Sequence, residues 1–214
     1  MARKLIDIKA SSFKQELTDV KADLLALGVY KEDKKLTGAE GEVDKKLGGW
    51  LGKLLRSGDF KGNAGEIHIA YGDDKIGSRR VGLVGLGKKG DVKVSTFRDA
   101  AGSLGKRAVG LGCKSVAVAL QSRRGKLDAG DVCQAIVEGA FIGAYKYDEF
   151  ISEKKGDDDT ARPGRISFKL YEGDSKAVKA GMGIGNAQKF ARTLANRPPN
   201  MVTPAALARE ARSM

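Results

Sequence analysis

The chain has 214 residues, 41% of them hydrophobic, which is enough for one folded domain with an appendage. Its longest apolar runs are only strand-sized, so we expect no signal peptide, no membrane span and a cytoplasmic location. Two cysteines, Cys113 and Cys133, are too few for a disulfide framework, and their apolar surroundings are typical of buried thiols.

Strands and helices alternate along the first 174 residues. The predicted strands are apolar at alternate positions or throughout, and they cover residues 4–10, 23–30, 66–71, 81–87, 115–120 and 166–172. Apolar residues that share one helical face predict helices over residues 40–56, from Ser95 to about Ala108, and over residues 128–145. This alternation predicts a three-layer α/β domain, residues 1–174, built on a parallel or mixed sheet.

Residues 175–214 have a different organisation. A helix with Asn186 as N-cap should end near Asn196, because two prolines follow and each removes a backbone donor. A second helix should then begin at once and reach barely three turns before Met214. We therefore predict an interdomain linker and the start of a further domain. The linker residues are Asn196, Arg197, Pro198, Pro199, Asn200, Thr203 and Pro204.

The formal net charge of +12 is concentrated in one window. Residues 75–126 contain thirteen Lys or Arg and two acids. If the loops of this window share one edge of the sheet, their field would attract phosphate backbones, whereas the simpler interpretation is a solubilising surface. Few aromatics accompany the charge, which favours duplex contact over stacking on single strands. The candidate contact residues are Arg79, Arg80, Lys88, Lys89, Arg123, Arg124 and Lys126.

Three apparent chemical motifs are weak. Gly82–Lys89 has the spacing of a phosphate-binding loop, but Lys89 stands where a Ser or Thr must bind magnesium. The only histidine, His68, lies in a predicted strand, which indicates a structural role. Adjacent acids at residues 157–159 cannot easily converge on one hard cation. We therefore predict no catalytic and no metal-binding residue in this chain.

Several segments resemble one family in the same order. The segment NRPPNMVTPAALAREA, residues 196–211, is similar to the connection between the N-terminal and catalytic domains of leucine aminopeptidases, the cytosol aminopeptidase family of two-metal exopeptidases. Further matching segments are DVKADLLALGVY, GDFKGNAGE, RVGLVGLGKKGD and VEGAFIGAYKYDEF. The resemblance covers essentially the whole chain.

This resemblance implies a macro-like α/β/α domain followed by a linker helix and a truncated second helix. In the family, two divalent metals (Zn, Mn or Mg) are held through motifs such as VGKGITFDTGG and NTDAEGRL, and neither motif occurs here. The resemblance therefore implies a non-catalytic, inactive chain without cofactors of its own. Its implied partners are a catalytic domain and the other subunits of a homohexamer.

A second hypothesis is a binding module. Some family members bind DNA, which matches the basic window, and a macro-like fold could accept an ADP-ribose-like nucleotide. The fold alone is weak support for that ligand.

Overall fold

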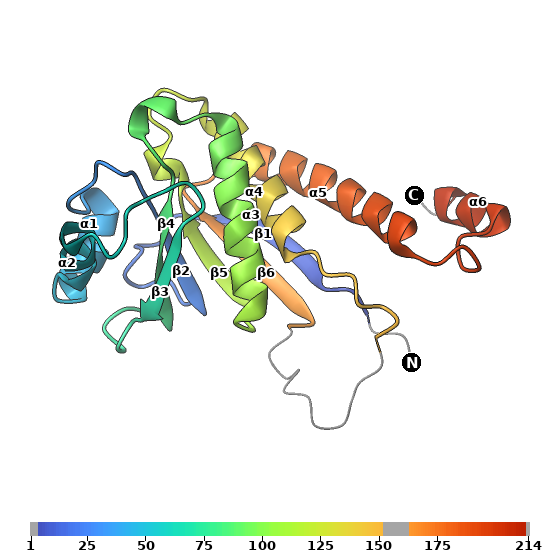
Figure 1. Ribbon diagram of the computed structural model, residues 1–214, viewed down its shortest axis with the longest axis horizontal. Coiled ribbons are helices and arrows are strands. Elements are labelled where there is room, and N and C mark those ends of the chain that lie inside the picture. The colour runs from blue at the N-terminus through green and yellow to red at the C-terminus, as the bar shows by residue number, and fades with distance from the viewer. Residues whose placement is uncertain (1–3, 152–162, 213–214) are drawn as a thin grey trace.

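The computed structural model describes residues 4–151 and 163–212. Its centre is a six-stranded sheet with the order β1-β6-β5-β2-β4-β3, in which β3 alone runs antiparallel to its neighbour (Figure 1). The strands are β1 (Asp7–Phe13), β2 (Leu24–Val29), β3 (Ile67–Tyr71), β4 (Arg80–Gly85), β5 (Ser115–Ala119) and β6 (Arg165–Tyr171). The predicted mixed sheet is confirmed.

Helices cover both faces of this sheet. On one face lie α3, α4 and α5, and on the other lie α1 and α2, while α6 stands apart at the end of α5 (Figure 1). The helices are α1 (Gly38–Lys46), α2 (Trp50–Ser57), α3 (Val94–Gly110), α4 (Ala129–Ala144), α5 (Ser175–Asn196) and α6 (Pro204–Arg212). Two short 3-10 turns are η1 (Lys89–Asp91) and η2 (Gln121–Arg123).

The core consists of two apolar clusters, one on each side of the sheet. Alternating side chains of β2 divide between them: Leu24 and Ala26 join the cluster under α3, α4 and α5, whereas Leu25 and Leu27 join the cluster under α1 and α2. Successive side chains of a strand point to opposite faces, so a strand covered on both sides is apolar throughout. The predicted three-layer α/β/α architecture is confirmed.

The single helix predicted over residues 40–56 is wrong. The structure has two helices, α1 and α2, because Gly48 and Gly49 take positive φ angles of 75° and 76°. That backbone conformation ends a helix and is open to glycine at no steric cost. Leu47 and Leu51, on either side of the break, still enter the same core cluster.

Two predicted helix starts are also wrong. The N-cap of α3 is Lys93 and not Ser95. The last long helix starts at Ser175 and not after Asn186, and the carboxylate of its N-cap, Asp174, accepts a hydrogen bond of 2.6 Å from the Ala177 amide. Glycines of α5 gave no helical signal, because glycine is a poor helix former in isolation.

Candidate functional site at the carboxyl edge of the sheet

The crevice between β2 and β5 is the place where an open α/β sheet usually binds ligands. These neighbouring strands are parallel. After β2 the chain continues to the side of the sheet that contains β4 and β3, whereas after β5 it continues to the opposite side, which contains β6. Side chains beyond the carboxyl ends of two such strands face a gap that the connecting loops leave open. We therefore take this edge as the first candidate site.

The Arg123 side chain fills this crevice. Its Nε donates a 3.0 Å hydrogen bond to the Gly28 carbonyl oxygen, and its Nη2 lies 3.3 Å from the Asp33 carboxylate. The guanidinium lies over the Tyr30 ring, 5.8 Å from the centroid. A Cβ at Gly28 would come within 3.1 Å of the Arg123 Cγ, so a side chain there would press on the arginine. The chain's own arginine thus occupies the usual ligand position.

Buried polar side chains lie on the residues next to Arg123 and on α1. Ser122 donates a short hydrogen bond to the carboxylate of Glu40, which is buried on α1. Burial raises the pKa of the Tyr30 phenol above its ordinary value. Gln121 is 5% exposed, and its side-chain amide finds no hydrogen-bond partner among the described residues. The sequence analysis did not identify Gly28, Tyr30, Asp33 and Glu40 as site residues. A signal was available only from the strand order, since residues that follow neighbouring parallel strands lie at the same edge of the sheet.

The seven predicted basic contact residues do not form one surface. Lys88 and Lys89 follow the carboxyl end of β4, and Arg124 and Lys126 follow that of β5, so these four share one edge of the sheet. By contrast, Arg79 and Arg80 lie at the start of β4, at the opposite edge, where Arg80 lies over the Tyr71 ring. The side chain of Arg123 is 15% exposed and is committed to the crevice. Contact with nucleic acid stays a prediction.

In the predicted linker, Arg197 joins the end of α5 to α6. The Nε and Nη2 atoms of Arg197 each donate a 3.0 Å hydrogen bond to Glu149, and its Nη1 donates one of 3.2 Å to Glu210 on α6. The hydrogen bonds with Glu149 raise the pKa of Arg197 further above its usual value. A planar guanidinium suits such a two-sided contact.

The other linker residues have local roles in the two turns. Thr203 Oγ1 accepts a 3.2 Å hydrogen bond from the Ala206 amide, and Pro204 is the first residue of α6, so the predicted cap is confirmed. The Asn196 side chain donates to the Arg192 carbonyl oxygen at 2.7 Å. The Pro198 carbonyl oxygen accepts a hydrogen bond from the Met201 amide, which closes a turn with Pro199 and Asn200 at its centre.

The apparent phosphate-binding motif has a packing role instead. Gly82 and Gly85 lie inside β4, and a Cβ at Gly85 would overlap the backbone of Asn63. Among the described residues, the next α-helix after the motif is α3, which begins only at Val94, so the motif does not lead directly into a helix N-terminus as a phosphate-binding loop does. Gly85 thus lets neighbouring backbone approach the strand, whereas Gly82 makes room for the Ile69 side chain.

Within the described residues, no group of three or more His, Cys, Asp and Glu could hold a metal ion. His68 lies on β3 with its ring 6.4 Å from that of Trp50. The acids at 157–159 lie outside the described residues. Both cysteines are buried, and burial raises their thiol pKa. Among the described helices, none is both long enough and apolar enough to cross a membrane.

Comparison with known proteins identifies the family of this chain. Residues 26–154 match the model of the N-terminal domain of the cytosol aminopeptidase family. The chain belongs to the cytosol aminopeptidase family. A probable cytosol aminopeptidase of Cyanothece sp. is 32% identical over 197 residues, and one of Aquifex aeolicus is 29% identical over 208 residues. The chain is covered to 92% and 97%, but it spans only 40% of either relative's length.

Solved structures with a similar fold include two enzymes. The bottromycin maturation enzyme BotP is 27% identical with a TM-score of 0.69, and the match covers 90% of this chain and 36% of BotP. A mutant of tomato leucine aminopeptidase has a TM-score of 0.78 at 23% identity, covering 99% of this chain and 42% of that one, which is a likeness of fold. BotP has also been solved in complex with Mn.

Proposed function

We propose that this chain acts as the non-catalytic N-terminal domain of a leucyl aminopeptidase, with a role in assembly or regulation. The observation that carries the proposal is the match of residues 26–154 to the family's N-terminal domain, together with coverage of only about 40% of the relatives' length. In this proposal, residues 1–174 form the macro-like domain, and residues 175–214 connect it to a catalytic domain in the cytoplasm.

The residues present do not fit the two divalent metals expected for the complete enzyme. Two-metal hydrolysis needs carboxylates that converge on both ions, and the described residues contain no such cluster. We therefore assign no catalytic step to this chain. Removal of N-terminal leucine from peptides, the Zn, Mn or Mg ions and the hexamer belong, in this proposal, to the complete enzyme.

An activity assay tests the proposal. The purified chain is incubated with leucyl-p-nitroanilide and Mn²⁺, and the expected rate is that of the buffer blank. A catalytic part of a family enzyme, assayed beside it, is the positive control. Turnover that follows the concentration of this chain through gel filtration and is abolished by a chelator would contradict a non-catalytic role.

The second candidate function is binding of duplex DNA through its backbone. The specific support is that Lys88, Lys89, Arg124 and Lys126 lie at one edge of the sheet. Such binding would weaken steeply with salt, and a chain using four phosphate contacts would give a log–log slope of about −3.6. A titration from 50 to 200 mM salt measures this slope, with a variant lacking all four charges as the control. An unchanged slope in that variant would exclude this edge.

A further inference from the structure

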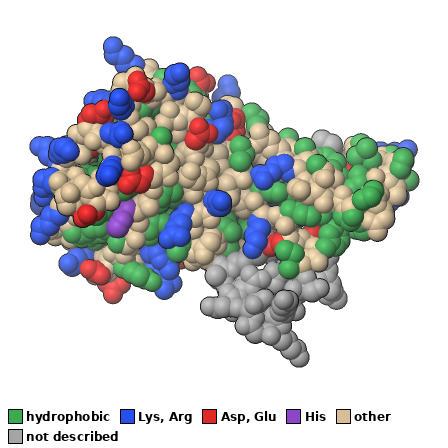
Figure 2. Space-filling model, viewed as in Figure 1, with side chains coloured by type: hydrophobic (Ala, Val, Ile, Leu, Met, Phe, Trp, Pro, Cys, Tyr) green, Lys and Arg blue, Asp and Glu red, His purple; other side chains and the backbone are tan. Residues whose placement is uncertain are grey.

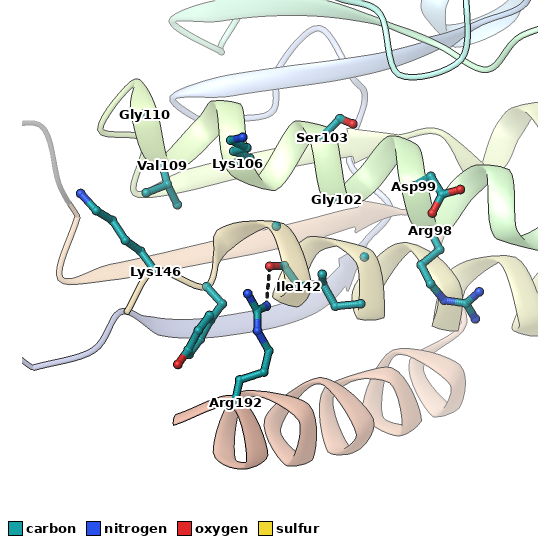
Figure 3. A pocket seen from close by; sticks show the side chains of 13 residues that line it. Arg98, Asp99, Gly102, Ser103, Lys106, Val109, Gly110, Ile142, Lys146 and Arg192 are labelled. Carbon is teal, nitrogen blue, oxygen red and sulfur yellow. Dashed lines mark hydrogen bonds between the residues drawn. The ribbon is translucent and has the colours of Figure 1, made fainter. Parts of the chain in front are cut away.

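A groove on the helical layer is separate from the carboxyl edge of the sheet and approaches the linker only at its α5 end, where Arg192 lines it. It runs along the outer side of the α3–α4 contact and reaches α5, and its volume is about 850 Å³ (Figure 3). Its α3 wall extends from Arg98 to Gly110, which is about 18 Å at the rise of an α-helix. A peptide of about five residues in extended conformation has the same length.

Glycines leave this groove open. A Cβ at Gly143 would overlap the carbonyl oxygen of Gly102, and one at Gly139 would overlap that of Arg98. The two helices can therefore lie almost backbone to backbone, as in other close helix pairs that use small residues. Gly102, Gly139 and Gly143 belong to the lining of the groove and contribute backbone but no side chain to it.

The walls carry an excess of positive charge around an apolar centre. Lys106 on α3, Lys146 after α4 and Arg192 on α5 line the groove and are exposed (Figure 3). Within the described part of the chain, neither lysine makes an ion pair or a hydrogen bond through its side chain. The exposed side chain of Ile142 and the half-buried Val109 lie between the charges.

The remaining charged groups of the groove are already paired or are acidic. Arg98 donates a 2.8 Å hydrogen bond to Glu138, which is buried on α4. Arg192 donates to the Ile142 carbonyl oxygen at 3.0 Å, and its guanidinium lies 4.1 Å from the centre of the Tyr145 ring. Asp99 is the one carboxylate among the lining residues. Within the described residues, Lys106 and Lys146 therefore remain available to pair with a ligand.

We propose that this groove binds a short acidic peptide segment of a partner protein, with an aliphatic side chain on Ile142 and carboxylates on Lys106 and Lys146. Charge complementarity requires the acidic groups, and the apolar centre requires a side chain that gains by leaving water. Arg192 fixes the wall of the groove, because its contacts with the Ile142 carbonyl oxygen and the Tyr145 ring hold its guanidinium in place.

Nucleic acid fits this groove less well. Phosphates would be attracted to the lysines, but they would leave Ile142 and Val109 facing a charged backbone. Tyr145 cannot serve as a stacking platform on the ring face that Arg192 already covers. A peptide satisfies both the charges and the apolar centre.

The test is a titration of the chain with a capped Glu-Glu-Leu-Glu-Glu peptide, followed by NMR. We expect saturable shifts of the Gly102 and Gly143 amides and of the Ile142 methyl groups. The same peptide with Gly in place of Leu should leave the Ile142 methyl signals unshifted, because it lacks the apolar group. Double reversal, Lys106→Glu with Lys146→Glu, should weaken binding by about tenfold, as expected for the loss of two exposed ion pairs.

A matched control reverses two exposed lysines elsewhere. The double variant Lys35→Glu with Lys53→Glu changes the net charge by the same amount. Lys35 precedes α1 and Lys53 lies on α2, on the opposite face of the sheet, so affinity for the peptide should change by less than about twofold. Four results would overturn the proposal. The first three are no saturable shifts with millimolar peptide, equal weakening in both double variants, and stronger shifts of the same signals with a short DNA duplex. Shifts that grow with protein concentration alone would also overturn it, since they would identify a second copy as the occupant.

Discussion

Single residues without side chains decide how closely the helices of this domain approach one another. A Cβ at Gly143 would overlap the backbone of α3, and one at Gly185 would come within 2.6 Å of the Phe141 ring. Gly183, by contrast, has open space where its Cβ would lie. Glycines in the same layer therefore differ in their effect on stability, although the sequence alone presents them alike.

Replacing Gly143 by Ala should destabilise the fold by about 3 kcal/mol or more, because the helices must separate to admit the methyl group. Replacing Gly183 by Ala in the exposed part of α5 should stabilise it by about 1 kcal/mol, since Ala is the better helix former. Urea unfolding of both variants measures the two changes. Equal effects of the two substitutions would show that α3 and α4 are not in backbone contact.

Glu66 should give the domain a pH-dependent share of its stability. Burial alone would raise the pKa of this carboxyl, but hydrogen bonds from the Lys61 and Asn63 amides and the Asn63 side chain lower it overall. A depressed folded pKa means that stability is gained above the ordinary carboxyl pKa and is lost as the pH falls through the folded value.

The Glu66→Gln variant should therefore be less stable than the wild type at pH 7, and this difference should shrink as the pH approaches 3. Urea unfolding at several pH values measures it. Glu42→Gln is the control, because Glu42 has one exposed partner, Lys45, at 3.9 Å. A stability difference for Glu66→Gln that stays constant over this pH range would exclude the carboxylate as its cause.

At the scale of elements, α6 differs from every other helix described here. It buries no residue, and Leu207 on its surface is 48% exposed. Side-chain hydrogen bonds connect it to the rest of the domain from Glu210 through Arg197 to Glu149. A helix with so little packing should open locally far more often than the strands of the sheet.

Replacing Arg197 by Ala should speed amide exchange in residues 204–212 by about threefold or more, the effect of losing a partly exposed ion pair. Arg209→Ala, which removes an exposed charge from the same helix, is the control and should leave exchange nearly unchanged. Hydrogen exchange followed by mass spectrometry measures both. Protection of wild-type α6 equal to that of β2 in a dilute monomer would contradict this view of the joint.

At the scale of the whole molecule, most charged side chains lie on the surface; the buried ones among the described residues are Glu40, Glu138 and Asp148. Figure 2 shows Lys and Arg side chains spread over the face toward the viewer, with acids interspersed. This distribution agrees with a solubilising surface as the role of much of the net charge of +12.

Adding Mn²⁺ or Zn²⁺ in slight excess should leave the thermal midpoint of this chain unchanged. Binding to the folded state alone raises stability by RT ln(1 + [L]/Kd), and the described residues offer no ligand cluster. Thermal unfolding with and without metal measures the effect, with a chelator-treated sample as the reference. A midpoint that rises steadily with metal concentration would show a site that this account lacks.

Much of the fold could be predicted from the sequence, and less of the candidate site. The six strands were predicted because buried strands such as β2 are apolar throughout. The helix break at Gly48 and the start of α5 at Ser175 were not, since a glycine can end one helix and pack tightly in another. The arrangement at the carboxyl edge depends on the contact between Arg123 and Gly28. These two residues are distant in the sequence and come together only when β2 and β5 pair.

The sequence by itself determined the layers, the cap at Thr203 and the resemblance to the cytosol aminopeptidase family, because these depend on local patterns and ordered motifs. Only the tertiary structure decided which charges share a surface. Arg80 and Lys88 are near neighbours in the chain, yet a strand separates them to opposite edges of the sheet, whereas Lys106 and Lys146 meet across one groove. Strand pairing and helix contacts set these distances, and neither is encoded in sequence spacing.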